Sequence, residues 1–165
     1  MHKILIIGLQ GSGKSTFANK LGKALKLEVI HLDKLYYKPG WIAVTKDEWD
    51  EILKEIISKN NWIIDGNYTR TLDFRISASD TIIFLNFNKI LCIYRAFKRS
   101  FDKNQPFDKV TGDRNKLSRG LIKKIITYDK KEVLNKLKLN ENTKKIFIAK
   151  NREELGEIFK KLTTN

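Results

Sequence analysis

A glycine-rich loop near the start of the sequence has the residue types and spacing that bind a nucleoside triphosphate. Residues 8–15 read Gly-Leu-Gln-Gly-Ser-Gly-Lys-Ser and match the pattern G-x-x-x-x-G-K-S/T at every required position. Glycines let backbone amides turn inward onto phosphates, and the positive end of the following helix adds favourable potential. The Lys14 ammonium suits the β- and γ-phosphates and the Ser15 hydroxyl suits Mg²⁺, so we expect ATP and Mg²⁺ to bind here. The predicted nucleotide-binding residues are Gly8, Gly11, Ser12, Gly13, Lys14, Ser15 and Thr16.

Other interpretations of this loop fit the residues less well. A dinucleotide-binding fingerprint needs a third glycine where this chain has Thr16. A translation-type GTPase would carry an Asn-Lys-x-Asp guanine motif, which the sequence lacks. A glycine-rich turn without function would not require the strand, the lysine and the hydroxyl that all occur here in order.

Two aspartates follow predicted strands. Asp65 comes after residues 62–64, where a carboxylate can hold Mg²⁺, directly or through water, opposite Ser15. The alternative for Asp65 is a turn formed by the Asp-Gly pair. Asp33 follows the predicted strand 27–30, with a helix N-cap as its alternative. We therefore predict that Ser15 and Asp65 bind Mg²⁺.

The elements that must position these residues alternate along the chain. Short apolar runs predict strands, and apolar residues at helical spacing predict the helices between them. A capping box from Thr45 to Glu48 begins one helix, and Ile90, Tyr94 and Phe97 lie on one side of another. This alternation predicts an α/β domain whose parallel sheet is covered on both faces and binds ligands at the carboxyl ends of its strands. Predicted strands cover residues 3–7, 27–30, 62–64, 81–85 and 146–149, and predicted helices begin near residues 14, 46, 89, 121 and 152.

The length suits a single domain spanning residues 1–165. One segment inside it has little periodicity: residues from about 102 to 119 contain Pro106, Gly112 and many charges. We interpret this segment as a mobile connection or lid.

Charge and composition restrict the partners and the compartment. The formal net charge is +14, and residues 81–165 carry 21 Lys/Arg against 9 Asp/Glu. Such a basic surface attracts polyanions, so DNA is a possible partner, although a lysine-rich composition gives the same excess without function. The single cysteine, Cys92, excludes internal disulfides and multi-cysteine zinc sites. Apolar runs are far shorter than a membrane span, and the N-terminus lacks the features of a signal peptide, so we expect a cytoplasmic protein.

The motifs that follow the loop resemble those of adenylate-kinase-like small nucleotide and metabolite kinases. Within that group they are most similar to bacterial DNA topology modulation proteins. The resemblance implies a three-layer P-loop NTPase fold with a five-stranded sheet in the order 2-3-1-4-5, ATP in the P-loop, and a short lid bearing arginines. It is carried by the glycine loop, His31-Leu32-Asp33-Lys34, Pro39-Gly40-Trp41, and residues 62–68 (Trp-Ile-Ile-Asp-Gly-Asn-Tyr) with Arg70.

The resemblance also implies roles for individual residues. In related kinases an aspartate at the position of Asp33 orients or deprotonates the attacking hydroxyl, or binds metal. Arginines near the positions of Arg70 and Arg75 bind the acceptor phosphate in nucleoside monophosphate kinases. This chain lacks the proline of those enzymes and places its arginine one position later, which argues against a monophosphate acceptor.

The remaining candidates lie on the acceptor loop and on later basic segments. Arginines equivalent to Arg95 and Arg99 stack on adenine and clamp the transferred phosphoryl group in related enzymes, with a solvated basic helix face as the alternative. Arg114 and Arg119 at the end of the predicted lid are candidates to close over the phosphates. Trp41, with neighbouring tyrosines, would form an aromatic wall for a ring-bearing acceptor, or else pack on the core.

These residues together predict an ATP-dependent phosphotransferase. Lys14, Asp33, Arg95 and Arg99 are its predicted catalytic residues, and Asp33, Arg70, Arg75 and Trp41 are predicted to contact the acceptor. The acceptor would be a nucleotide, a nucleoside or another small hydroxyl compound. The alternative is a nucleotide-binding regulatory protein whose basic C-terminal half contacts DNA.

Overall fold

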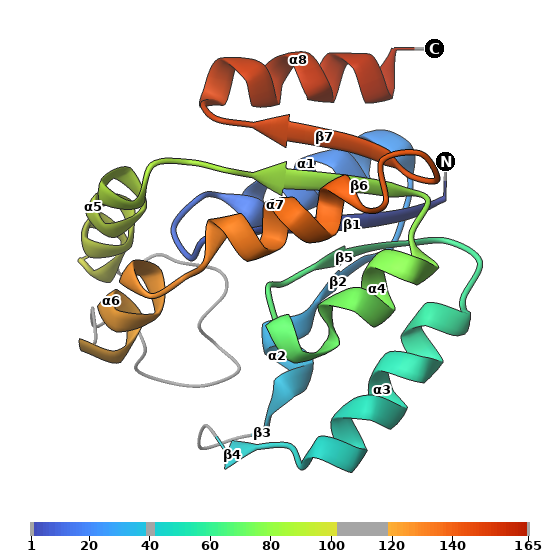
Figure 1. Cartoon of the computed structure of the whole chain (residues 1–165), viewed down its shortest axis with the longest axis horizontal. Helices are drawn as coiled ribbons and strands as arrows, with labels where there is room; N and C mark the ends of the chain where they lie inside the picture. Colours follow the sequence, from blue (N-terminus) through green and yellow to red (C-terminus); the bar gives the residue numbers. More distant parts are fainter. Residues whose placement is uncertain (1, 39–41, 102–118, 165) are drawn as a thin grey trace.

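A parallel sheet lies at the centre of the molecule in the computed structural model, which describes residues 2–38, 42–101 and 119–164 (Figure 1). Its strands lie in the order β2-β5-β1-β6-β7, and each neighbouring pair is parallel. Counted along the five predicted strands this order is 2-3-1-4-5, so the predicted sheet is confirmed. The strands are β1 (Lys3–Gly8), β2 (Val29–His31), β5 (Trp62–Asp65), β6 (Thr81–Leu85) and β7 (Lys145–Ala149).

Side chains from each strand divide between the two faces of the sheet. On β1, Leu5 and Ile7 belong to one buried cluster, whereas Ile4 and Ile6 belong to the other. All four are fully buried. A parallel strand that is covered on both faces has no solvent-facing side, which explains why residues 4–7 are apolar without alternation.

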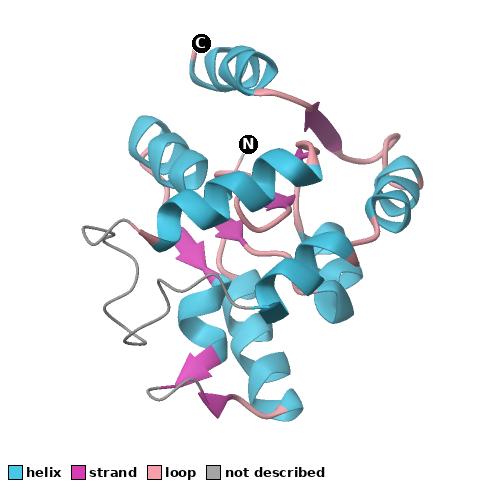
Figure 2. Cartoon of the chain, turned by 90° about the vertical axis from the view of Figure 1, so that its left-hand side faces the viewer, coloured by secondary structure: helices cyan, strands magenta, loops and turns pink. Residues whose placement is uncertain are grey.

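Helices from separate parts of the chain cover the two faces (Figure 1 and Figure 2). The arrangement of helices, sheet and helices is the predicted three-layer α/β fold. The cluster that contains Leu5 is covered by α3 (Lys46–Ser58), α4 (Leu72–Ala78) and α7 (Lys130–Lys138). The cluster that contains Ile4 is covered by α1 (Lys14–Leu25), α5 (Lys89–Ser100), α6 (Arg119–Ile126) and α8 (Arg152–Thr163).

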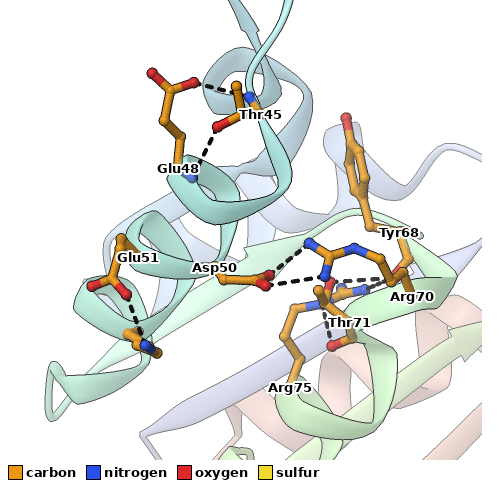
Figure 3. A network of polar contacts seen from close by, with 9 residues as sticks. Thr45, Glu48, Asp50, Glu51, Tyr68, Arg70, Thr71 and Arg75 are labelled. Carbon is orange, nitrogen blue, oxygen red and sulfur yellow. Dashed lines mark hydrogen bonds and ion pairs between the residues drawn. The ribbon is translucent and has the colours of Figure 1, made fainter.

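The predicted capping box begins α3. The Glu48 amide donates to Thr45 Oγ1 at 3.2 Å, and the Thr45 amide donates to Glu48 Oε2 at 2.9 Å (Figure 3). These two bonds satisfy amides that a helix N-terminus would otherwise leave without partners. The reciprocal bonds fix where α3 begins, and Trp49 and Leu53 of this helix are buried against the sheet.

Several short elements were not predicted from the sequence. They are too short or too polar for a periodic pattern: in α7, for example, only Val133 and Leu137 are buried. The hairpin formed by β3 and β4 is one in which each strand has only two residues. These elements are α2 (Leu32–Tyr36), β3 (Tyr37–Lys38), β4 (Ile42–Ala43), the 3₁₀ helix η2 (Thr69–Thr71), α4 and α7.

Much of the apolar side predicted for α5 does not face the core, although Ile93 packs against it. Ile90 is 77% exposed and Tyr94 is 59% exposed, whereas the buried residues of this helix are Cys92 and Ala96. These two side chains are small, so they let the helix approach the glycine loop closely. A Cβ at Gly11 would lie 2.3 Å from the Cys92 carbonyl oxygen. Close approach to the loop therefore decides the orientation of α5.

Some predicted residues lie outside the described part of the chain. Trp41 and Arg114 are among them, together with residues 102–118 of the predicted lid. Arg119 is the first residue of α6. Among the described residues, no helix has the length and apolar character that crossing a membrane requires.

Candidate functional site

The glycine loop connects β1 to α1 at the carboxyl edge of the sheet. Gly11 and Gly13 have φ values of +81° and +95°, a left-handed conformation that favours glycine. The Ser12 amide donates to the Leu9 carbonyl at 3.1 Å and closes the turn. Lys14 Nζ donates to the same Leu9 carbonyl at 3.0 Å, so the ammonium lies against the loop. The loop thus has the turn, the cation and the helix start that its sequence predicts.

Replacing Gly11 with alanine is expected to destabilise the nucleotide-free protein more than replacing Gly13. Both substitutions place a Cβ in the left-handed region, at a cost of about 1–2 kcal/mol. Only the Cβ at position 11 would also overlap the Cys92 carbonyl; the Gly13 Cβ would meet nothing within 4 Å. Urea denaturation should therefore show a further loss of about 1–3 kcal/mol for Gly11→Ala. Equal losses would mean that contact with α5 does not hold the loop.

The two predicted Mg²⁺ ligands lie in contact. Ser15 Oγ donates to Asp65 Oδ2 at 2.6 Å. Asp65 is 4% exposed, and its second oxygen, Oδ1, is buried with no hydrogen-bond partner among the residues that the structure describes. A buried carboxylate oxygen without a donor is costly unless a cation or a water molecule satisfies it. Ser15 and Asp65 therefore fit Mg²⁺, which binds proteins through few carboxylates and keeps phosphate and water ligands.

His31 and Asn19 join this pair and were not predicted. His31 Nδ1 lies 3.0 Å from Asp65 Oδ2, and His31 Nε2 lies 3.0 Å from Asn19 Oδ1. The sequence alone gives His31 no metal role, because no cysteine or histidine lies near it in the chain. The signal that could have found it is strand register, since β2 and β5 pair His31 directly with Asp65.

Asp33 lies on the acceptor side, near the end of β2. It is exposed and accepts a hydrogen bond from the Tyr68 hydroxyl at 2.7 Å. The N-cap of α2 is His31, so the alternative interpretation of Asp33 as that helix's N-cap is wrong. Burial raises the pKa of the Tyr68 hydroxyl, and the neighbouring Asp33 carboxylate raises it further. Tyr68 is therefore a stable donor that orients the carboxylate.

Aromatic rings surround this aspartate–tyrosine pair. The Tyr36 ring lies 4.8 Å from that of Tyr68, 5.0 Å from that of Tyr37 and 5.0 Å from that of Trp49, measured between centroids. Trp49 is buried, whereas the three tyrosines are half-buried. The rings therefore form a continuous aromatic cluster that extends from the buried Trp49 to the surface beside Asp33.

The two arginines predicted to contact the acceptor have different surroundings (Figure 3). Arg70 donates from Nη1 and Nη2 to the Asp50 carboxylate of α3, at 3.1 and 2.6 Å. This ion pair is exposed, so solvent weakens it and an anion can compete for the guanidinium. The guanidinium of Arg70 thus lies beside α3, and in this structure it is paired with the Asp50 carboxylate.

Arg75 requires a correction. Its side chain is fully buried and donates to the carbonyls of Thr71, Gly66 and Tyr68, at 3.3, 2.8 and 2.6 Å. Burial lowers the pKa of this guanidinium to about 10. A side chain in this position has no exposed donor for an acceptor. Arg75 instead holds the loop that carries Asn67 and Tyr68.

The basic face of α5 meets the glycine loop through one of its two predicted arginines. Arg95 Nη1 lies 3.4 Å from the Ser12 carbonyl, and its guanidinium lies 5.2 Å from the Phe87 ring centroid. Burial lowers the pKa of Arg95, and the nearby Arg152 lowers it further. Arg99 is exposed, one turn further along the helix. The structure therefore brings Arg95, but not Arg99, to the loop.

Three further polar side chains at this edge of the sheet were not predicted. Asn67 Oδ1 accepts from the Gly8 amide at 3.3 Å and from the Tyr128 hydroxyl at 3.1 Å. Lys130 Nζ donates to the Phe87 carbonyl at 2.5 Å, and burial lowers its pKa. Tyr128 and Lys130 were not predicted because the residues just before α7 and at its start have no clear apolar period.

Comparison with known proteins identifies the fold. No protein-family model matches the chain. The chain is similar to the crystal structure of a gluconokinase from Sinorhizobium meliloti 1021, with 16% identity and a TM-score of 0.58 over 98% of this chain and 89% of that one. It is also similar to a shikimate kinase from Aquifex aeolicus, with 19% identity and a TM-score of 0.53 over 96% and 94% of the two chains. The chain therefore shares the α/β fold of these two structures, with its five-stranded parallel sheet and helices on both faces.

Proposed function

We propose that this protein is an ATP-dependent kinase that phosphorylates a hydroxyl group of a small molecule. The proposal depends on one observation: the residues suited to bind phosphate, metal and acceptor all lie at the same edge of the sheet. The phosphate loop follows β1, the Ser15–Asp65 pair lies at the end of β5, and Asp33 follows β2. These three strands are neighbours, so their carboxyl ends lie together. Both similar structures are kinases that act on small molecules, which supports the same class.

The residues at this edge suggest how they would act. The amides of residues 8–15 and the Lys14 ammonium bind the phosphates, and Ser15 with Asp65 holds Mg²⁺. Bound Mg²⁺ supplies positive charge next to the phosphate oxygens. Asp33, oriented by Tyr68, accepts the proton or the hydrogen bond of the attacking hydroxyl. The γ-phosphoryl group passes to that oxygen and ADP leaves, while Arg95 stabilises the charge that develops.

The surroundings of Asp33 favour an acceptor without a phosphate group. Arg75 is buried, and Arg70 is paired with Asp50, so an acceptor phosphate would have to displace that carboxylate. Lys38, in the neighbouring hairpin, forms an ion pair with Glu48 at 2.8 Å. The tyrosine rings beside Asp33 suit a sugar or nucleoside ring. We therefore place nucleosides and other neutral hydroxyl compounds ahead of nucleotides as acceptors.

A coupled assay of ADP release tests the proposal. Nucleosides, nucleotides, sugars, sugar acids and polyols would each be supplied with ATP and Mg²⁺, with the Lys14→Ala variant as the blank. We expect at least one hydroxyl compound to give turnover well above the blank. Turnover at the level of the blank across the panel would contradict the kinase proposal. Calorimetry with Mg²⁺ and ATP would then show whether nucleotide binding itself remains.

The alternative, a nucleotide-binding regulator that contacts DNA, is supported by the positive charge of residues 81–165 and by the resemblance to topology modulation proteins. A basic surface alone gives weak, salt-sensitive and sequence-independent binding. We place this function second because Asp33, which Tyr68 orients on the acceptor side, has no use in it.

A further inference from the structure

A chain of four polar side chains connects α1 to the ends of two strands. Ser15 and Asn19 are four residues apart, so they lie on the same face of α1. That face meets Asp65 of β5 and His31 of β2, whose Cα atoms are partners in the parallel register. The order of contacts is Ser15, Asp65, His31 and Asn19.

Two donors in this chain converge on the same carboxylate oxygen. Ser15 Oγ lies 2.6 Å from Asp65 Oδ2, and His31 Nδ1 lies 3.0 Å from it. An ionised carboxylate only accepts hydrogen bonds, so the Nδ1 proton of His31 bonds to Asp65. On the other side of the ring, Asn19 Oδ1 lies 3.0 Å from Nε2, so the imidazole is contacted at both nitrogens.

Burial makes this arrangement rigid. The side chains of His31 and Asp65 are only 11% and 5% exposed. With Oδ2 held by two donors, rotation of the carboxylate would break both bonds in a place that water reaches poorly. Oδ1 is then the oxygen that remains for a cation or its water, and it is the atom without a partner among the described residues.

We propose that His31 is a positioning residue, which holds the Asp65 carboxylate in the orientation that Mg²⁺ requires. The inference rests on the proposed function, because it assigns His31 a task only when Mg²⁺ accompanies ATP. Side chains that orient metal ligands through hydrogen bonds typically change metal affinity about 10–100-fold when they are removed. A residue that merely fills space beside β2 would have no such effect on the metal.

The test measures how much Mg²⁺ improves ATP binding, using calorimetry with and without MgCl₂. His31→Leu keeps an apolar side chain of similar bulk and removes the donor, whereas His31→Asn keeps a donor near the position of Nδ1. In His31→Leu we expect the increase in ATP affinity caused by Mg²⁺ to be about 10–100-fold smaller than in wild type. In His31→Asn most of that increase should remain. ATP binding without Mg²⁺ should be the same in all three proteins, because the loop and Lys14 are unchanged.

Each other result has a definite meaning. An equal Mg²⁺ gain in wild type and His31→Leu, or an equal loss in both variants, would overturn the role of His31 while leaving the kinase proposal intact. Wild-type protein that binds no ATP would overturn the proposed function itself. If His31→Leu fails to fold, Asn19→Ala serves instead, since it releases the far side of the ring. A full Mg²⁺ gain in that variant would then overturn the inference, and a reduced gain would support it.

Discussion

Replacing Lys14 with alanine is expected to lower kcat for phosphoryl transfer by about 10³-fold or more and to weaken ATP binding. The ammonium already lies against the loop, 3.0 Å from the Leu9 carbonyl, so it needs little rearrangement to reach a phosphate. In the proposed reaction its charge would act where negative charge develops on the transferred group, and water could not replace a cation fixed at that point. Steady-state kinetics with the best acceptor from the assay of ADP release, together with calorimetry of ATP binding, would measure the two effects.

Lys23→Ala is the matched control for this experiment. Lys23 lies on the same helix and is exposed, so the substitution removes the same charge from α1 at a distance from the loop. We expect little change in either measurement. A loss in Lys14→Ala of less than about tenfold in kcat, equivalent to about 1.4 kcal/mol, would mean that the loop does not direct this lysine at the reacting phosphate.

Replacing Arg75 with methionine is expected to lower the free energy of unfolding by about 2–4 kcal/mol. Methionine keeps much of the length and volume of the side chain but removes every donor. The Tyr68 carbonyl would keep its bond from the Thr71 amide, whereas the Gly66 carbonyl would lose the 2.8 Å bond that Arg75 supplies. Relief of the buried charge offsets part of this loss, which is why the expected value is below the sum of the bonds. Urea denaturation followed by circular dichroism would measure it.

Arg70→Met is the natural comparison, because it removes the same chemical group five residues earlier. Arg70 bonds to a carboxylate on the surface, where solvent screens the pair. Its effect on unfolding should be clearly smaller than that of Arg75→Met. Similar effects of the two substitutions would contradict the structural role assigned to Arg75.

The sequence was sufficient for the sheet because its strands are apolar on both faces. Residues 4–7 and 82–85 carry no polar alternation, and such runs separated by amphipathic helices have few other arrangements. The contact between Ser15 and Asp65 followed from the same logic, since Asp65 ends β5 and Ser15 lies at the start of α1, just after the loop that follows the neighbouring strand β1. These predictions depend on local pattern and on topology, and both can be read from a single chain.

Other parts of the site depend on which residue lies opposite which, and that information is absent from local pattern. His31 became a candidate only when the register paired it with Asp65. Arg75 was wrongly assigned to the acceptor. The sequence does not show whether an arginine that follows a strand points to solvent or, as here, to the carbonyls of a buried loop. The side of α5 that packs was predicted only in part, since a close approach of Cys92 to Gly11 outweighs the burial of larger apolar side chains such as Ile90.

The position of β2 in the sheet separates the two halves of the proposed reaction. β2 has three residues and, within the part of the chain that the structure describes, a single neighbouring strand, β5, whereas β1 is central and paired on both sides. Edge elements of this kind open locally at a lower free energy than the central strands. Such an opening would displace Asp33 and His31 together and leave the loop on β1 in place. The loop and Lys14 would then still bind the nucleotide, although with less gain from Mg²⁺, while Asp33 would no longer reach the acceptor. Partial unfolding would therefore produce an inactive complex before it produced an empty one.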